Sequence, residues 1–138
     1  MVTPGASGAL LLLAALLMNP GDGMLMTDPG YPCNRQFMRL VEGHAQLVPV
    51  GADTQYQLSG KLVEDNWRDS TAGVLVASPA NPTGTALSKE ALGELSRVVR
   101  ARGGHLLVDE IYHGLCYDGA APSVLEVDNE AFVINSFS

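Results

Sequence analysis

The chain has 138 residues and a formal net charge of −7, from 15 acidic and 8 basic residues, and 46% of its residues are apolar. This length and composition suit one folded domain and exclude a disordered or fibrous chain, and an acidic chain without a basic cluster argues against nucleic-acid or anionic-membrane partners. The two cysteines, Cys33 and Cys116, form neither a disulfide framework nor a metal-binding spacing, which predicts a cytoplasmic protein.

An apolar run near the start of the chain, residues 9–18, invites comparison with a targeting signal or a membrane anchor. A bilayer-spanning helix needs about 20 apolar residues, and a signal peptide places basic residues ahead of its apolar segment. The run is too short, and a glycine-rich turn at residues 2–8 precedes it instead. We therefore interpret it as a buried helix that follows a turn.

The hydrophobic pattern along the rest of the chain predicts alternating helices and short apolar strands. We expect helices at residues 8–18, 33–42, 58–66 and 88–102, and strands at residues 24–27, 46–50, 74–77, 106–108 and 131–135. The last of these helices has the clearest signals, because Ser88 suits its N-cap, Leu87 and Leu92 suit a hydrophobic staple, and Gly103 suits its end. Strands that are apolar throughout and alternate with helices predict an α/β fold, a mostly parallel sheet with helices on both faces.

Ligands of such sheets bind beyond the carboxyl ends of the strands, so the residues after each strand are the candidates for a site. Polar and turn-forming residues follow the predicted strands at 28–32, 78–84, 109–113 and 136–138, and the turn at 5–8 opens the first helix. The sequence therefore predicts one site at one edge of the sheet.

Ala6 and Ser7 lie at the amino end of the first predicted helix. Free backbone N–H groups and the positive end of the helix dipole favour a phosphate there, and the Ser7 hydroxyl could add a contact. The segment matches neither the P-loop nor the dinucleotide-binding pattern, and a helix start without a ligand is the alternative.

Asp109 directly follows a predicted buried strand. A carboxylate in that position is costly without a partner, which could be a metal, a cationic ligand nitrogen or an arginine, although an N-cap or a surface-loop acid is also compatible with the pattern. We expect Glu110 to be solvated or hydrogen-bonded to backbone. The spacing of these acids to His113 matches no known ligand set, so we predict no metal site.

Tyr31 and Asn81 both lie in short loops restricted by proline. The Tyr31 ring could stack on a flat ligand or cover the surface. Asn81 is held extended by Pro82, and its amide could bind a ligand hydroxyl or cap the turn.

The order and spacing of these segments resemble the class I/II aminotransferases, which are fold type I enzymes dependent on pyridoxal phosphate (PLP). The segments that carry the resemblance are Thr3-Pro4-Gly5-Ala6-Ser7-Gly8-Ala9-Leu10, Asp28-Pro29-Gly30-Tyr31-Pro32, Ser78-Pro79-Ala80-Asn81-Pro82-Thr83-Gly84, Val108-Asp109-Glu110-Ile111-Tyr112 and Asn135-Ser136-Phe137-Ser138. The resemblance implies that residues 1–138 are the central part of the large, PLP-binding domain. The amino-terminal segment and the small domain of the family would lie outside the chain.

The resemblance also implies a role for each candidate residue. Ala6, Ser7 and Ser136 would bind the cofactor phosphate, and Tyr31 would stack on the pyridine ring. Asn81 and Tyr112 would hydrogen-bond the 3-oxygen of that ring, and Asp109 would pair with its nitrogen. The resemblance further implies a cis peptide bond at Asn81-Pro82, and less firmly one at Asp28-Pro29.

In the family pattern, the lysine that forms the Schiff base comes directly after the position of Ser138. The two lysines of the chain, Lys61 and Lys89, lie in segments that match other helices of the pattern. The resemblance therefore places no catalytic residue among these 138 residues and implies that they are inactive by themselves.

The function implied for the intact protein is PLP-dependent transfer of an amino group between an amino acid and a 2-oxo acid, in amino acid metabolism or biosynthesis and as a homodimer. Another fold type I enzyme, such as a C–S lyase or a cyclopropane-carboxylate synthase, would share the same cofactor site. An aminotransferase-like regulatory domain of a transcription factor is a further alternative. The sequence does not identify the amino acid substrate.

Overall fold

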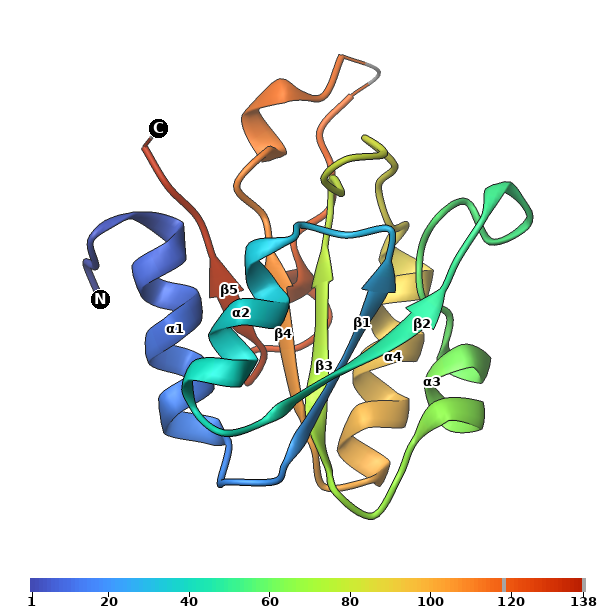
Figure 1. The fold of residues 1–138 in the computed structure, drawn as a ribbon. Coiled ribbons are helices and arrows are strands. Elements are labelled where there is room, and N and C mark those ends of the chain that lie inside the picture. Colours follow the sequence, from blue (N-terminus) through green and yellow to red (C-terminus); the bar gives the residue numbers. More distant parts are fainter. Residues whose placement is uncertain (118, 138) are drawn as a thin grey trace.

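The computed structural model describes residues 1–117 and 119–137 and contains a five-stranded parallel sheet between two layers of helices (Figure 1). The strands are β1 (Gly23–Asp28), β2 (His44–Pro49), β3 (Thr71–Ala77), β4 (His105–Asp109) and β5 (Phe132–Ile134), in the sheet order β2-β1-β3-β4-β5. All neighbouring strands pair in parallel. The predicted α/β fold is thereby confirmed.

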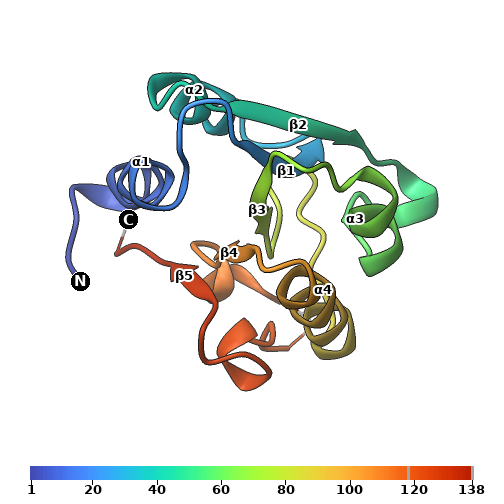
Figure 2. The ribbon, with the colours of Figure 1, turned by 90° about the horizontal axis from the view of Figure 1, so that it is seen from below.

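The helices cover both faces of the sheet. Helices α1 (Gly5–Leu17) and α2 (Cys33–Leu40) lie on one face, and α3 (Gly60–Asn66) and α4 (Lys89–Ala101) lie on the other (Figure 2). Strand side chains alternate between two buried clusters, so that Met24 and Met26 pack under α1 and α2, whereas Leu25 packs under α3 and α4. The described residues also form three short 3₁₀ turns, which are Ala52–Thr54, His113–Leu115 and Val124–Glu126.

The residues predicted to begin and end helix α4 are found in those positions. The Ser88 hydroxyl accepts a hydrogen bond from Ala91 N, and Leu87 and Leu92 are both buried. Gly103 follows the helix with φ +70°, a conformation that glycine adopts without strain. The predicted boundaries of the other elements differ from the observed ones by a few residues; α1, for example, begins at Gly5 rather than at Gly8.

The prediction that the first helix is buried is wrong for its outer face. Leu10 and Ala14 are buried against the sheet, but Leu12 and Leu16 are 45% and 69% exposed. α1 lies in an outer layer of the chain, so only one of its sides packs on the strands. None of the helices described here is both long enough and apolar enough to cross a membrane.

Candidate active site

The carboxyl ends of the parallel strands bring the predicted site residues together. Ala77 pairs with Asp109 across β3 and β4, and Asp109 pairs with Ile134 across β4 and β5. The Asn81 loop therefore leaves the sheet beside Asp109, and Ser78 N donates to Asp109 O at 3.0 Å. This placement follows from parallel pairing, in which all strand ends meet at one edge.

A cavity of about 130 Å³ opens at this edge. Its lining includes six of the seven cofactor-binding residues expected from the sequence, from four separate segments: Ala6, Ser7, Tyr31, Asn81, Asp109 and Tyr112. The sequence reasoning missed Leu10, Ala77 and Ile111, which complete the lining. Leu10 lies one helical turn after Ala6, so helical periodicity could have placed it beside the site. Ile111 lies two residues after Asp109, so its closeness to a strand end could have identified it.

Ser136 lies outside this cavity. It lines a separate open depression together with residues at the start of the chain and of α1, including Thr3 and Gly5. This position is next to the amino end of α1 but apart from Tyr31 and Asn81. Ser138, after which the family pattern places its lysine, lies outside the described residues.

The amino end of α1 offers backbone N–H groups to a ligand. The N-cap is Pro4, and no side chain of the described residues caps the helix. No acidic residue lies in its first turn. Gly5 N donates to Thr3 O at 2.8 Å, whereas the N–H groups of Ala6 and Ser7 have no acceptor within the helix, so these groups and the helix dipole favour an anion there.

The Asp109 carboxylate is partly buried, and it accepts one hydrogen bond, from Ile111 N at 3.1 Å. Burial raises the pKa of Asp109 above its ordinary value, and the Ile111 N–H only partly opposes that rise. Among the described residues, no lysine, arginine or histidine forms an ion pair with Asp109. An arginine partner for Asp109, one of the alternatives from the sequence, is therefore absent among the described residues. The carboxylate lines the cavity and could bind a cationic nitrogen of a ligand.

Glu110, the neighbouring acid, has a different environment. It is 3% exposed and accepts hydrogen bonds from Val124 N at 2.8 Å and from Ser123 Oγ at 3.1 Å. His113 Nδ1 lies 3.5 Å from its other oxygen. The expectation of a backbone hydrogen bond is confirmed, whereas a solvated Glu110 is wrong, because this side chain anchors the segment that returns to β5.

Tyr31 contacts polar groups on two elements. Hydrogen bonding to the Cys33 thiol raises the pKa of Tyr31, and the Ser7 hydroxyl acts in the opposite direction. Gly30, immediately before it, lies so close to Thr27 that an added Cβ would be 2.7 Å from the Thr27 carbonyl oxygen. The loop 28–32 therefore holds the Tyr31 ring at the cavity by tight backbone packing.

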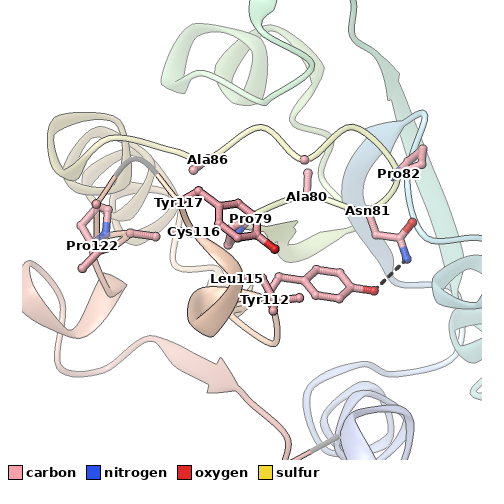
Figure 3. A pocket seen from close by; sticks show the side chains of 14 residues that line it. Pro79, Ala80, Asn81, Pro82, Ala86, Tyr112, Leu115, Cys116, Tyr117 and Pro122 are labelled. Atoms are coloured by element: carbon pink, nitrogen blue, oxygen red, sulfur yellow. Dashed lines mark hydrogen bonds between the residues drawn. The ribbon is translucent and has the colours of Figure 1, made fainter.

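Asn81 and Tyr112 meet across the site. Asn81 Nδ2 donates to the Tyr112 hydroxyl at 3.4 Å, and Figure 3 shows the two side chains pointing toward each other. The peptide bond Asn81-Pro82 is cis, as expected, and so are Asp28-Pro29 and Ser78-Pro79. A second and larger hollow of about 670 Å³ adjoins this pair, and its lining includes Pro79, Tyr112, Leu115, Tyr117 and Pro122.

Comparison with known proteins identifies the family. The model of the family "Aminotransferase class I and II" matches residues 1–138. The chain belongs to the class I and II aminotransferases. The expected membership is thereby confirmed over the whole chain.

The chain is similar to individual relatives and solved structures over most or all of its length. The chain is 36% identical over 140 residues to a valine–pyruvate aminotransferase of Mycobacterium tuberculosis, and the match covers 100% of the chain and 36% of that relative. It is 37% identical to a 1-aminocyclopropane-1-carboxylate synthase of Arabidopsis thaliana over 81% of the chain and 24% of that enzyme. A crystal structure of an aminotransferase from Mycobacterium tuberculosis superimposes with a TM-score of 0.91 at 37% identity, over 99% of this chain and 37% of that one. The chain thus spans between 24% and 37% of the length of these relatives.

Proposed function

We propose that the protein containing this chain is a PLP-dependent aminotransferase that transfers an amino group between an amino acid and a 2-oxo acid. The observation that carries the proposal is the single cavity lined by Ser7, Tyr31, Asn81, Asp109 and Tyr112, because these side chains match the distinct chemical parts of the cofactor. When bound, PLP supplies a sink for the electron pair released at the substrate Cα.

The residues of the cavity would hold PLP by complementary chemistry. The N–H groups of Ala6 and Ser7 would bind the phosphate at the amino end of α1, with Ser136 contributing from the neighbouring depression. The Asp109 carboxylate would hold a proton on the pyridine nitrogen. Its lack of a cationic partner among the described residues supports this pairing.

The remaining polar side chains would orient the ring. Tyr31 would cover one face and exclude water from it. Asn81 and Tyr112 would both donate to the ring's 3-oxygen, and their mutual hydrogen bond places the two donors side by side. The nucleophilic lysine would come from outside these residues, directly after Ser138.

The domain assignment and the cellular setting are part of the same proposal. Residues 1–138 would form part of the large domain of a cytoplasmic homodimer active in amino acid metabolism, with the small domain and the amino-terminal segment supplied by other parts of the protein. The identity to family members along the whole chain supports this assignment.

A second candidate function is formation of a cyclopropane carboxylate. The 37% identity to a plant 1-aminocyclopropane-1-carboxylate synthase favours it. The cofactor residues discussed above would serve either reaction.

An assay of the intact protein distinguishes these functions. The purified protein is loaded with PLP and incubated with single amino acids and pyruvate or 2-oxoglutarate, and the keto acid product is measured. A second arm uses S-adenosylmethionine without a keto acid and measures the cyclopropane product. Amino transfer in the first arm supports the proposal, whereas turnover in the second arm alone would replace it with the second candidate. A protein that binds PLP without turnover in either arm would contradict both.

A further inference from the structure

The Asn81 loop is held at both ends by one buried side chain, Gln57. Gln57 is 5% exposed and lies in the connection between the first 3₁₀ turn and α3. Its Nε2 donates to the Ala77 carbonyl oxygen at 3.1 Å and to the Thr85 carbonyl oxygen at 2.9 Å. One amide group therefore ties the last residue of β3 to the far end of the loop.

The loop is also closed by its own backbone. Ala80 N donates to Thr85 O at 2.9 Å, and Gly84 N donates to Ala80 O at 2.7 Å. Thr85 O thus accepts from both the loop and Gln57, and Asn81 projects from the middle of the closed segment. A loop fixed at these points presents its side chains in one orientation, whereas a loop free at Thr85 can pivot about the end of β3.

Packing alone does not require an amide at position 57. Gln57 Oε1 is buried and has no hydrogen-bond partner among the described residues, which carries a desolvation cost. A methionine of similar length would fill the same space without that cost. The bonds from Nε2 to Ala77 and Thr85 are therefore the contribution specific to glutamine.

We propose that Gln57 is a positioning residue of the cofactor site, which acts by holding the loop so that Asn81 donates to the ring of bound PLP. The inference rests on the proposed function, because it needs Asn81 to contact the cofactor. Gln57 itself is absent from the lining of the cavity and bonds to the backbone of Ala77 and Thr85, so it would act on the site indirectly, through the position of the loop that carries Asn81.

The test is a double-mutant cycle on the intact protein, with PLP dissociation constants from absorbance titration as the readout. Asn81→Ala removes the contact with the cofactor, and Gln57→Met removes the link to the loop. Each is expected to weaken PLP binding by about tenfold, the effect of one lost hydrogen bond. In the Asn81→Ala background, Gln57→Met should change the dissociation constant by less than about twofold.

A spectroscopic readout separates positioning from a general loss of stability. Loss of a hydrogen-bond donor to the 3-oxygen of PLP makes the anionic form of that oxygen less favourable. The pH midpoint of the bound cofactor's absorption change should therefore rise in both Asn81→Ala and Gln57→Met. The matched control is Gln46→Met. Gln46 is also a buried glutamine, 8% exposed, but it accepts from Thr71 Oγ1 at 2.7 Å, away from the loop. This control should leave both the dissociation constant and the pH midpoint unchanged.

The outcomes separate the two claims. If Asn81→Ala binds PLP normally, the proposed role of Asn81 is wrong. If Asn81→Ala weakens PLP and Gln57→Met does not, or if the two losses add independently, Gln57 is not a positioning residue.

A second variant covers the case in which Gln57→Met does not fold. Burial keeps the carboxylic acid of Gln57→Glu protonated at low pH, and its O–H can donate to one of the two carbonyl oxygens. Its PLP affinity relative to the unmodified protein should therefore be higher at low pH and fall as pH rises. A ratio that does not change with pH would overturn the proposal.

Discussion

The Asn81 side-chain amide donates to the Tyr112 hydroxyl at 3.4 Å, although the two residues are 31 positions apart in the chain. Their contact joins the loop after β3 to the segment after β4. It exists because these neighbouring parallel strands end in register, with Ala77 opposite Asp109.

This pair yields the first prediction. Tyr112→Phe keeps the ring but removes one donor to the cofactor's 3-oxygen. We expect PLP binding by the intact protein to weaken roughly 10-fold, the range for a hydrogen bond to a charged or polar group, while the melting temperature without PLP stays within error. Equilibrium titration with PLP checks the affinity, and an unchanged dissociation constant would remove Tyr112 from the site.

Asp109→Asn should change stability and activity in opposite directions. Burial raises the pKa of Asp109, so its contribution to the stability of the cofactor-free protein is present at acidic pH and is lost as pH rises through the raised pKa. At neutral pH, the asparagine variant without PLP should therefore melt at a higher temperature than the unmodified protein, and the difference should vanish at pH values below the ordinary carboxyl pKa.

The same variant loses the charge that would pair with the pyridine nitrogen. Amino transfer should fall by roughly 10²–10³-fold, the usual effect of removing one preorganised electrostatic contact. Steady-state kinetics and thermal melts at two pH values check both effects. Near-normal turnover would contradict the assigned role.

The sequence predicted the fold class and the edge of the sheet that holds the site because both follow from short-range patterns. Apolar strands alternating with helices specify a covered parallel sheet, and the polar residues after each strand then share an edge. The convergence of Tyr31, Asn81 and Asp109 on one cavity is the geometric consequence.

Features that depend on distant contacts were not predictable in this way. Gln57 is a polar residue in a predicted loop, and its two bonds to the Asn81 loop span 20 and 28 positions. The burial of Glu110 depends on Ser123 and Val124, which lie 13 and 14 positions further along the chain. The exposed outer face of α1 likewise reflects which elements lie beside it, and periodicity carries no such information.

Acid sensitivity should depend on Asp128. Burial alone would raise its pKa, but the Arg100 guanidinium, the Ser96 hydroxyl and the Glu130 N–H outweigh burial and lower the pKa to about 2. A depressed carboxyl pKa contributes stability that is present above the ordinary value near 4 and is lost as pH falls toward about 2.

The variant that tests this contribution is Asp128→Asn in the intact protein. It should lower the free energy of unfolding by about 2 kcal/mol at neutral pH. The decrease in that free energy between pH 4 and pH 2 should be smaller in the variant than in the unmodified protein. Asp65→Asn is the matched control, since Asp65 pairs with Lys61 on the exposed surface of α3 and should leave the melting temperature unchanged. Equal effects of the two variants in denaturant unfolding would contradict the assignment.

Two glycine substitutions should have opposite effects. Gly30→Ala places a Cβ 2.7 Å from the Thr27 carbonyl oxygen, so the loop must shift, at a cost of about 1–3 kcal/mol and with weaker PLP binding as Tyr31 moves. Gly93→Ala on α4 meets nothing within 4 Å and should stabilise the protein by about 0.5–1 kcal/mol without affecting PLP. Denaturant unfolding and PLP titration check the pair, and a harmless Gly30→Ala would show that the loop tolerates displacement.

Borohydride reduction of the PLP-loaded intact protein, followed by peptide mapping, shows whether these residues surround PLP held by a lysine next to Ser138. We expect the cofactor label on the lysine immediately after Ser138, on the peptide that continues from β5. A label on Lys61 or Lys89, or no covalent label at all, would contradict it.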